Sequence, residues 1–333
     1  MRRVALLAVL CALTTAVLAG DKKKIGLVFD VGGLGDKSFN DAANRGLERA
    51  KKELGVETEY KEPGEGNARE GELRRFAVKK ADLVFGIGFM FTDDITALAE
   101  KFPKVHWACV DYSTKEGQKL PANLLALKFK EQEGAFLVGA LAALVSKSGK
   151  IGFVGGMNIP LIRKFEAGYR AGAKHARADS TVSAAYAGNT GDAFKNPTKG
   201  KELALAQLDQ GVDVIFHASG STGLGVFEAC KERGKLAIGV DSDQWDPKMP
   251  DTILTSMVKQ VDVGVFEAIK AEAEGKFEGG RIIELGLKEG GVGYIHDEHN
   301  KKLIPDEIHK KVESFREEIV AGKIAVPSEL DSK

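Results

Sequence analysis

Short apolar runs alternate along this chain with segments whose apolar residues recur at helical spacing. The runs predicted as strands are 24–29, 57–60, 82–87, 105–110, 124–128, 150–154, 181–186, 213–217, 236–240 and 253–258. The segments predicted as helices are 38–54, 67–80, 92–101, 131–147, 160–177, 198–210, 222–233, 261–275 and 305–321. Regular strand–helix alternation predicts an α/β protein with parallel sheets covered by helices on both faces.

The first of these units sets the pattern for the rest. An apolar strand over 25–29 is followed by a turn with three glycines between positions 32 and 35, and Asp36 or Ser38 can cap the next helix. In open parallel sheets, ligands bind at the carboxyl ends of the strands. The residues of this unit that we expect at such a ligand-binding edge are Asp30, Phe39 and Asn40.

An internal repeat is the most informative feature of the sequence. Residues 24–50 align without gaps on 150–176, and 81–112 runs parallel to 212–243 in the same order. Two matches in the same order are hard to attribute to chance. The repeat predicts two similar lobes with a cleft between their matching edges.

Several further residues are expected at this cleft, each with a plainer alternative. Asp111 and Asp241 each follow a buried strand and can accept hydrogen bonds from a ligand or serve as turn residues. Phe194 lies in a polar loop, where an aromatic ring can stack on a flat ligand. Phe39 can do the same or belong to the core. Lys259 ends an apolar strand and is either a surface lysine or a partner for a carboxylate such as Asp241, with a ligand hydroxyl shared between them.

Composition excludes some partners. Lys plus Arg and Asp plus Glu both number 48, so the chain lacks the basic surplus expected of a nucleic-acid-binding protein. Residues 1–19 have a charged start, an apolar centre and small residues before the end, which predicts a signal peptide cleaved after Ala19. Cys109 and Cys230 lie in apolar segments and are expected to be buried free thiols, although a disulfide between them is not excluded.

Enzyme signatures are missing from the sequence. The glycine turn lacks the third glycine of a dinucleotide fingerprint, and there is no nucleophile elbow, P-loop or zinc signature. His296 and His299 stand three residues apart, but their neighbours are typical of a solvated turn. We therefore expect no catalytic residues, no cofactor and no metal site.

Five ordered motifs carry a family resemblance. They are DVGGLGDKSFN (30–40), DVIFHASGSTG (213–223), IGVDSDQ (238–244), TSMVKQVDVGV (255–265) and the tail IPDEIHKKVESFREEIVAGKIAVP (304–327). Together they resemble the basic membrane protein family, which includes purine nucleoside receptors of bacterial ABC transporters. The resemblance implies a type I periplasmic-binding-protein fold with two Rossmann-like lobes, joined by a hinge of three segments. It also implies a non-enzymatic protein that delivers its ligand to an ABC permease in the inner membrane.

The resemblance further implies lobe boundaries and residue roles. The N-terminal lobe would comprise 20–127 plus about 258–284, and the C-terminal lobe 128–257 plus about 285–333. Phe39 and Phe194 would stack on a purine, and Asp241 with Lys259 would hold the ribose hydroxyls. The remaining implied ligand contacts are Asp30, Asn40, Asp111 and the backbone around Gly220.

Two features bear on location and ligand. Ala19-Gly20-Asp21 stands where many family members have a lipid-bearing cysteine, so a soluble periplasmic form is favoured over a lipid anchor. The alternative ligand for the same fold is a sugar or another small polar solute, because aromatic rings and carboxylates also serve sugar sites.

Overall fold

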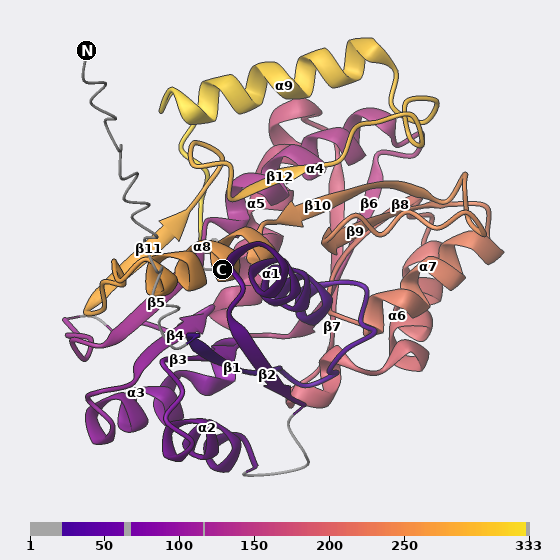
Figure 1. Ribbon diagram of the computed structural model, residues 1–333. Coiled ribbons are helices and arrows are strands. Elements are labelled where there is room, and N and C mark those ends of the chain that lie inside the picture. The colour runs from indigo at the N-terminus through magenta and orange to yellow at the C-terminus, as the bar shows by residue number, and fades with distance from the viewer. Residues whose placement is uncertain (1–21, 63–67, 116, 331–333) are drawn as a thin grey trace, which may run out of the picture.

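The computed structural model describes residues 22–62, 68–115 and 117–330 and contains two six-stranded sheets (Figure 1). In spatial order, the first sheet comprises β11 (Arg281–Leu285), β5 (Leu124–Phe129), β4 (His106–Val110), β3 (Leu83–Ile87), β1 (Lys24–Val28) and β2 (Glu57–Lys61). The second comprises β12 (Val292–Tyr294), β10 (Ile253–Lys259), β9 (Leu236–Asp241), β8 (Val214–Ala218), β6 (Lys150–Met157) and β7 (Thr181–Gly188).

The helices are α1 (Phe39–Leu54), α2 (Ala68–Val78), α3 (Thr92–Lys101), α4 (Glu131–Val145), α5 (Pro160–Ala176), α6 (Pro197–Asp209), α7 (Thr222–Glu232), α8 (Val261–Ala273) and α9 (Asp306–Val320). Two short 3-10 helices, η1 (Phe89–Phe91) and η2 (Gly191–Phe194), follow β3 and β7. All the strands and helices predicted from the sequence are present. The sequence pattern missed β11 and β12, because β11 is largely exposed and β12 has only three residues.

The two sheets have the same strand order, as the internal repeat predicts. The repeated segments 24–50 and 150–176 form β1–α1 and β6–α5, which occupy the same place in their sheets. Every pairing in the first sheet is parallel, whereas in the second β12 runs antiparallel to β10. The prediction of parallel sheets is therefore correct except at this one edge.

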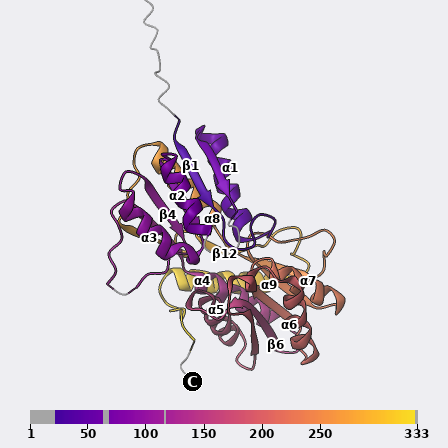
Figure 2. The same cartoon turned by 90° about the horizontal axis from the view of Figure 1, so that it is seen from below.

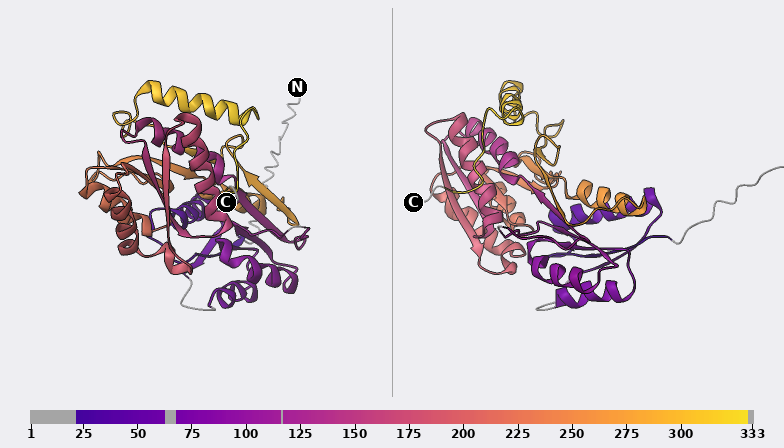
Figure 3. Two further views of the ribbon diagram at one scale, coloured as in Figure 1. Left: turned by 180° about the vertical axis from the view of Figure 1, so that it is seen from behind. Right: turned by 90° about the vertical axis from the view of Figure 1, so that its left-hand side faces the viewer.

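The central strands of each sheet are buried on both faces, which explains their continuous apolar character. In β1, Leu27 belongs to the core on the α1 side, while the next residue, Val28, packs with residues of α2 and α3 such as Phe76 and Ile95. On the second sheet, α4 and α5 pack together, as do α6 and α7. Figures 2 and 3 show the two layered bodies side by side.

The chain passes between the two sheets three times: after β5, after β10, and between β11 and β12. Each of the first two passages leads into a helix that packs in the other body, because α8 packs on α1 and α4 packs on α5. We call the first sheet with α1–α3 and α8 the first lobe, and the second sheet with α4–α7 and α9 the second lobe. The carboxyl ends of both sets of parallel strands face the junction between the lobes.

A glycine shared by the two copies of the repeat has a packing role. A Cβ at Gly46 of α1 would collide with the Asp262 carbonyl of α8, and a Cβ at Gly172 of α5 would collide with the Phe136 carbonyl of α4. The repeat therefore preserves the close approach of one helix pair in each lobe.

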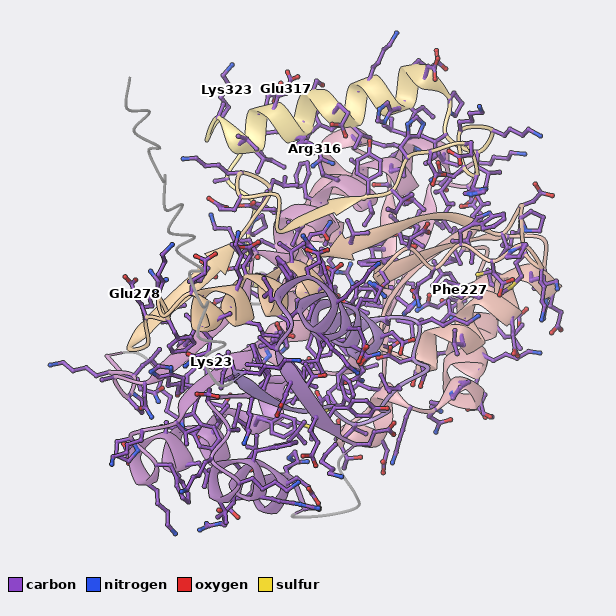
Figure 4. All side chains as sticks on the ribbon, viewed as in Figure 1. Lys23, Phe227, Glu278, Arg316, Glu317 and Lys323 are labelled. Carbon is purple, nitrogen blue, oxygen red and sulfur yellow. The ribbon has the colours of Figure 1, made fainter. Side chains whose placement is uncertain are left out.

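The last helix, α9, lies across the second lobe against α4 (Figure 1). Its residues Val312, Phe315 and Ile319 are buried, whereas Glu317 and, beyond the helix, Lys323 project into solvent (Figure 4). Within the described segments, no helix is both long and apolar enough to cross a membrane. The predicted signal peptide lies outside the described residues.

Cys109 in β4 and Cys230 in α7 are both buried and free, which confirms the expectation of two unpaired thiols.

Candidate functional site: a pocket between the lobes

A pocket lies where the strand ends of the two lobes meet. The structure brings all eight sequence-predicted site residues to its wall: Asp30, Phe39, Asn40, Asp111, Phe194, Gly220, Asp241 and Lys259. Further lining residues that the sequence reasoning missed are Val31, Asp36, Phe89, Leu161, Ile162, Phe165, Ala218, Ser219 and Val240. Because strands of both sheets contribute their carboxyl ends or following residues, the pocket exists only when both lobes are together.

The turn after β1 is held by Asp36. Its carboxylate accepts hydrogen bonds from the backbone N–H groups of Ser38 (2.8 Å), Asn40 (2.9 Å) and Asp41 (3.2 Å). The Ser38 hydroxyl makes no capping bond, so of the two caps proposed from the sequence Asp36 is the one that serves α1. A carboxylate is favoured here because the N-terminus of a helix carries partial positive charge.

Asn40 fixes the position of Asp30. The Asn40 amide Nδ2 donates to Asp36 (3.0 Å), and its Oδ1 accepts the backbone N–H of Asp30 (2.9 Å). An amide nitrogen has two donors, so one N–H of Asn40 remains for a ligand. The first-lobe side of the pocket is thus a rigid polar edge rather than a free loop.

Burial raises the pKa values of all four carboxyl groups that line the pocket, those of Asp30, Asp36, Asp111 and Asp241. Burial raises the pKa of Asp30 to about 7, although the hydrogen bond from the Val31 N–H opposes the change. Burial likewise raises the pKa of Asp241 to about 6, against the opposing effects of Lys259 and the Ser38 hydroxyl. Both groups can accept N–H or O–H donors from a ligand that replaces their lost water.

Lys259 is the buried cation of the site. Its Nζ lies 2.6 and 2.7 Å from the two carboxylate oxygens of Asp111 and 3.1 Å from Glu131 Oε1, and its side chain is 2% exposed. Burial acts to lower the pKa of Lys259, but the carboxylates of Asp111 and Glu131 outweigh it and the pKa is raised. Lys259 is therefore a partner of carboxylates and not a surface lysine. Its partners are Asp111 and Glu131, because the end of β4 reaches it from the first lobe, whereas Asp241, the carboxylate suggested from the sequence, acts on it at a longer distance.

Asp111 and Asp241 occupy equivalent positions in the two lobes and share an unusual backbone. Both are non-glycine residues in the left-handed region, with φ of 59° and 64°. Such conformations carry a cost and are concentrated at functional sites. In both lobes the chain turns sharply after the strand, so that each carboxylate lies at the pocket.

Aromatic rings make up much of the remaining wall: Phe39, Phe89, Phe165 and Phe194. The rings of Phe89 and Phe194 approach from opposite lobes in an edge-to-face arrangement, with centroids 6.5 Å apart. The repeat could have identified Phe89, since the gapless alignment of 81–89 on 212–220 places it opposite Gly220, which was predicted. Phe165, interpreted from the sequence as core, is buried and also lines the pocket.

The lobes touch beside the pocket on one flank. The Ser38 hydroxyl donates to Asp241 Oδ2 (2.6 Å), the Ser242 hydroxyl donates to the Ser38 carbonyl (3.0 Å), and Arg45 donates to Ser242 (2.9 Å). A second hollow adjoins the pocket through Phe89, Asp111 and Leu161. The hydrogen bonds of Ser38 and Ser242 therefore hold the two lobes in contact at one side of the pocket.

The histidine pair considered in the sequence makes stacking contacts. The His296 ring stacks on His309 with centroids 3.7 Å apart, and His299 stacks on Trp245 at 3.9 Å. Across the described part of the chain, no group of three or more His, Cys, Asp or Glu side chains is arranged to hold a metal ion.

Comparisons with protein families and with known proteins show which proteins this chain resembles. The family model described as ABC transporter substrate-binding protein PnrA-like (Bmp) matches residues 22–329. Basic membrane protein A1 of Borrelia garinii subsp. bavariensis is 37% identical over 319 residues, which cover 95% of this chain and 91% of that protein.

Solved structures of binding proteins share the fold of this chain. An ABC transporter solute-binding protein from Aeropyrum pernix K1 superposes with a TM-score of 0.82 at 32% identity, covering 92% of this chain and 94% of that one. A glucose-galactose binding protein from Geobacillus stearothermophilus shares the fold alone, with a TM-score of 0.59 at 18% identity over 86% of this chain and 100% of that one. The fold is thus that of type I periplasmic binding proteins, as the resemblance implied, and the matched family consists of transporter binding proteins rather than enzymes. The chain belongs to the Bmp family of PnrA-like substrate-binding proteins of ABC transporters.

Proposed function

We propose that the pocket binds a purine nucleoside, which the lobes enclose and the protein delivers to an ABC permease. The observation that carries the proposal is the joint presence, in one pocket, of aromatic rings from both lobes and of the polar groups Asp241 and Lys259. A purine has flat faces for Phe39 and Phe194, and a ribose has hydroxyls for a carboxylate and an ammonium.

The polar groups favour a donor-rich, uncharged ligand. Asp30 and Asp241 offer acceptors, while Lys259 is already neutralised by Asp111 and Glu131. A phosphate would add negative charge beside four lining carboxyls, those of Asp30, Asp36, Asp111 and Asp241. This supports a nucleoside over a nucleotide.

The test is titration calorimetry with guanosine, adenosine and cytidine on the wild type and on Phe194→Ala. Stacking of one base on an aromatic ring is worth about 1–3 kcal/mol, so the variant should bind at least about tenfold more weakly. Tyr60→Ala is the matched control, since Tyr60 is an exposed aromatic of β2 that is not among the pocket's lining residues. Unchanged affinity in Phe194→Ala would remove this residue from the site.

The second candidate ligand is a sugar, and the glucose-galactose binding protein that shares the fold favours considering it. A thermal-shift panel with ribose beside the nucleosides separates the two. Stabilisation by ribose with none by any nucleoside would refute the nucleoside proposal.

We also propose an extracytoplasmic location, with residues 1–19 removed on export and no lipid attached. Basic membrane protein and lipoprotein relatives support a site of action outside the cytoplasm. Mass measurement of the mature protein from native cells tests this, because cleavage after Ala19 and a lipid-bearing cysteine give different masses.

A further inference from the structure

Glu131 is a buried carboxylate next to the pocket whose role is not explained by ligand contact. It is the first residue of α4, where the chain has just left the first sheet, and it is 1% exposed. It is not among the residues lining the pocket, but its Oε1 lies 3.1 Å from Lys259 Nζ. Its Oε2 accepts a hydrogen bond from Lys164 Nζ at 3.0 Å.

The two carboxylates that hold Lys259 come from different lobes. Asp111 follows β4 of the first lobe, whereas Glu131 and Lys259 belong to the second, at the start of α4 and the end of β10. Any separation of the lobes would move Asp111 away from Lys259 and leave Glu131 beside it. Since a buried charge that loses its partner is strongly destabilising, a resident partner within the same lobe is needed.

The Lys259 ammonium has both carboxylates close to it. Its Nζ donates to both oxygens of Asp111, at 2.6 and 2.7 Å, and forms an ion pair with Glu131 Oε1 at 3.1 Å. A ligand hydroxyl that reaches Lys259 from the pocket competes with Asp111 for the ammonium, because Asp111 lines the same pocket. Asp111 lines the pocket and can exchange, whereas Glu131 lines only the adjoining hollow and contacts both Lys259 and Lys164.

We propose that Glu131 is a positioning residue: it holds the Lys259 ammonium at the pocket wall while Asp111 exchanges between Lys259 and the bound ligand. This inference rests on the proposed nucleoside function and assigns the hydroxyl-bearing part of the ligand to Lys259. Lys164 supports the arrangement, because with Lys259 it lowers the pKa of Glu131 against the opposing effect of burial.

The test compares guanosine with the free base guanine on Glu131→Gln. Glutamine preserves the shape of the side chain but removes the charge that holds Lys259, so the affinity for guanosine should fall about tenfold or more. Guanine has no ribose and should bind the variant as it binds the wild type. A merely structural role for Glu131 would weaken both ligands alike.

Glu166→Gln is the matched control. Glu166 is a buried glutamate on α5 that pairs with Arg170 (2.7 Å) and accepts from the Tyr186 hydroxyl, and no contact joins it to Lys259. Its substitution should leave the guanosine-to-guanine affinity ratio unchanged. Glu131→Asp keeps the charge but shortens the side chain, so it should show an intermediate loss for guanosine even if Glu131→Gln fails to fold.

The experiment distinguishes failure of the positioning role from failure of the proposed function. If the wild type binds guanosine and the affinity ratio is the same in the Glu131 variants, the positioning role is refuted and the proposed function stands. If the wild type binds no nucleoside, the proposed function fails and this inference fails with it.

Discussion

Replacing Lys259 with methionine should destabilise the protein strongly, because it removes the cation from between two buried carboxylates. Methionine keeps much of the length of the side chain and suits the surrounding rings, since those of Phe39 and Phe129 lie 5.2 and 5.1 Å from the ammonium. The loss should therefore come from charge rather than from packing. Asp111 and Glu131, at 2.6 and 3.1 Å, would be left facing one another without their shared partner.

The expected size follows from the burial of the group. Removing one partner of a buried ion pair costs about 3–5 kcal/mol, because the remaining charge keeps its desolvation penalty without compensation. The two carboxylates left by Lys259→Met put the change at the upper part of that range. Adding Asp111→Asn to the same chain should recover part of the loss, since one of the unpaired charges is then gone.

Lys276→Met provides the control for losing a lysine charge. Lys276 pairs with Glu274 at 2.8 Å, but the side chains of the two residues are 74% and 41% exposed. Exposed pairs contribute about 0–1 kcal/mol, so this variant should unfold at nearly the wild-type denaturant concentration.

The assay is urea denaturation followed by circular dichroism at pH 7 and again near pH 4. In Lys259→Met the unpaired carboxyls take up protons more readily than in the wild type, so the deficit should shrink as the pH falls. A deficit below about 1 kcal/mol at pH 7, or one that does not depend on pH, would refute the account of Lys259 as the neutralising cation of this site.

Two further predictions concern the first-lobe edge of the pocket. Asp30 has a pKa of about 7 against an ordinary 3.8, so its protonated form stabilises the fold below about pH 4 and that contribution is lost as the pH rises through 7. Asp30→Asn should therefore gain stability relative to the wild type between pH 4 and pH 8, by at most about 4 kcal/mol, as measured by thermal midpoints across that range; a difference independent of pH would contradict the raised pKa. Gly88→Ala should lower both the thermal midpoint and the ligand affinity, because Gly88 has a φ of 116° and a Cβ there would collide with the Asp30 carboxyl. Gly35→Ala is its control, since Gly35 has a φ of 91° but open space around it, and equal effects on affinity would rule out the collision.

Much of the site could be predicted because its residues follow a local rule. A buried strand, its carboxyl end and the next helix are all visible in a short window of sequence, as at Asp30 and Phe39. The repeat then extends that rule to the second lobe, where Asp241 takes the place that Asp111 has in the first. The sequence alone therefore determined the helices, ten of the twelve strands of the described residues and the common strand order of the two sheets.

The tertiary structure decided which of these residues meet. Lys259 pairs with Asp111 and Glu131 rather than Asp241, a choice set by how the two lobes approach and not by any spacing along the chain. The edge-to-face contact of Phe89 with Phe194 and the small edge strand β12 likewise depend on contacts between distant segments. Periodicity and strand ends are local properties of the chain, whereas charge pairing across a cleft depends on distances that only the packed lobes define.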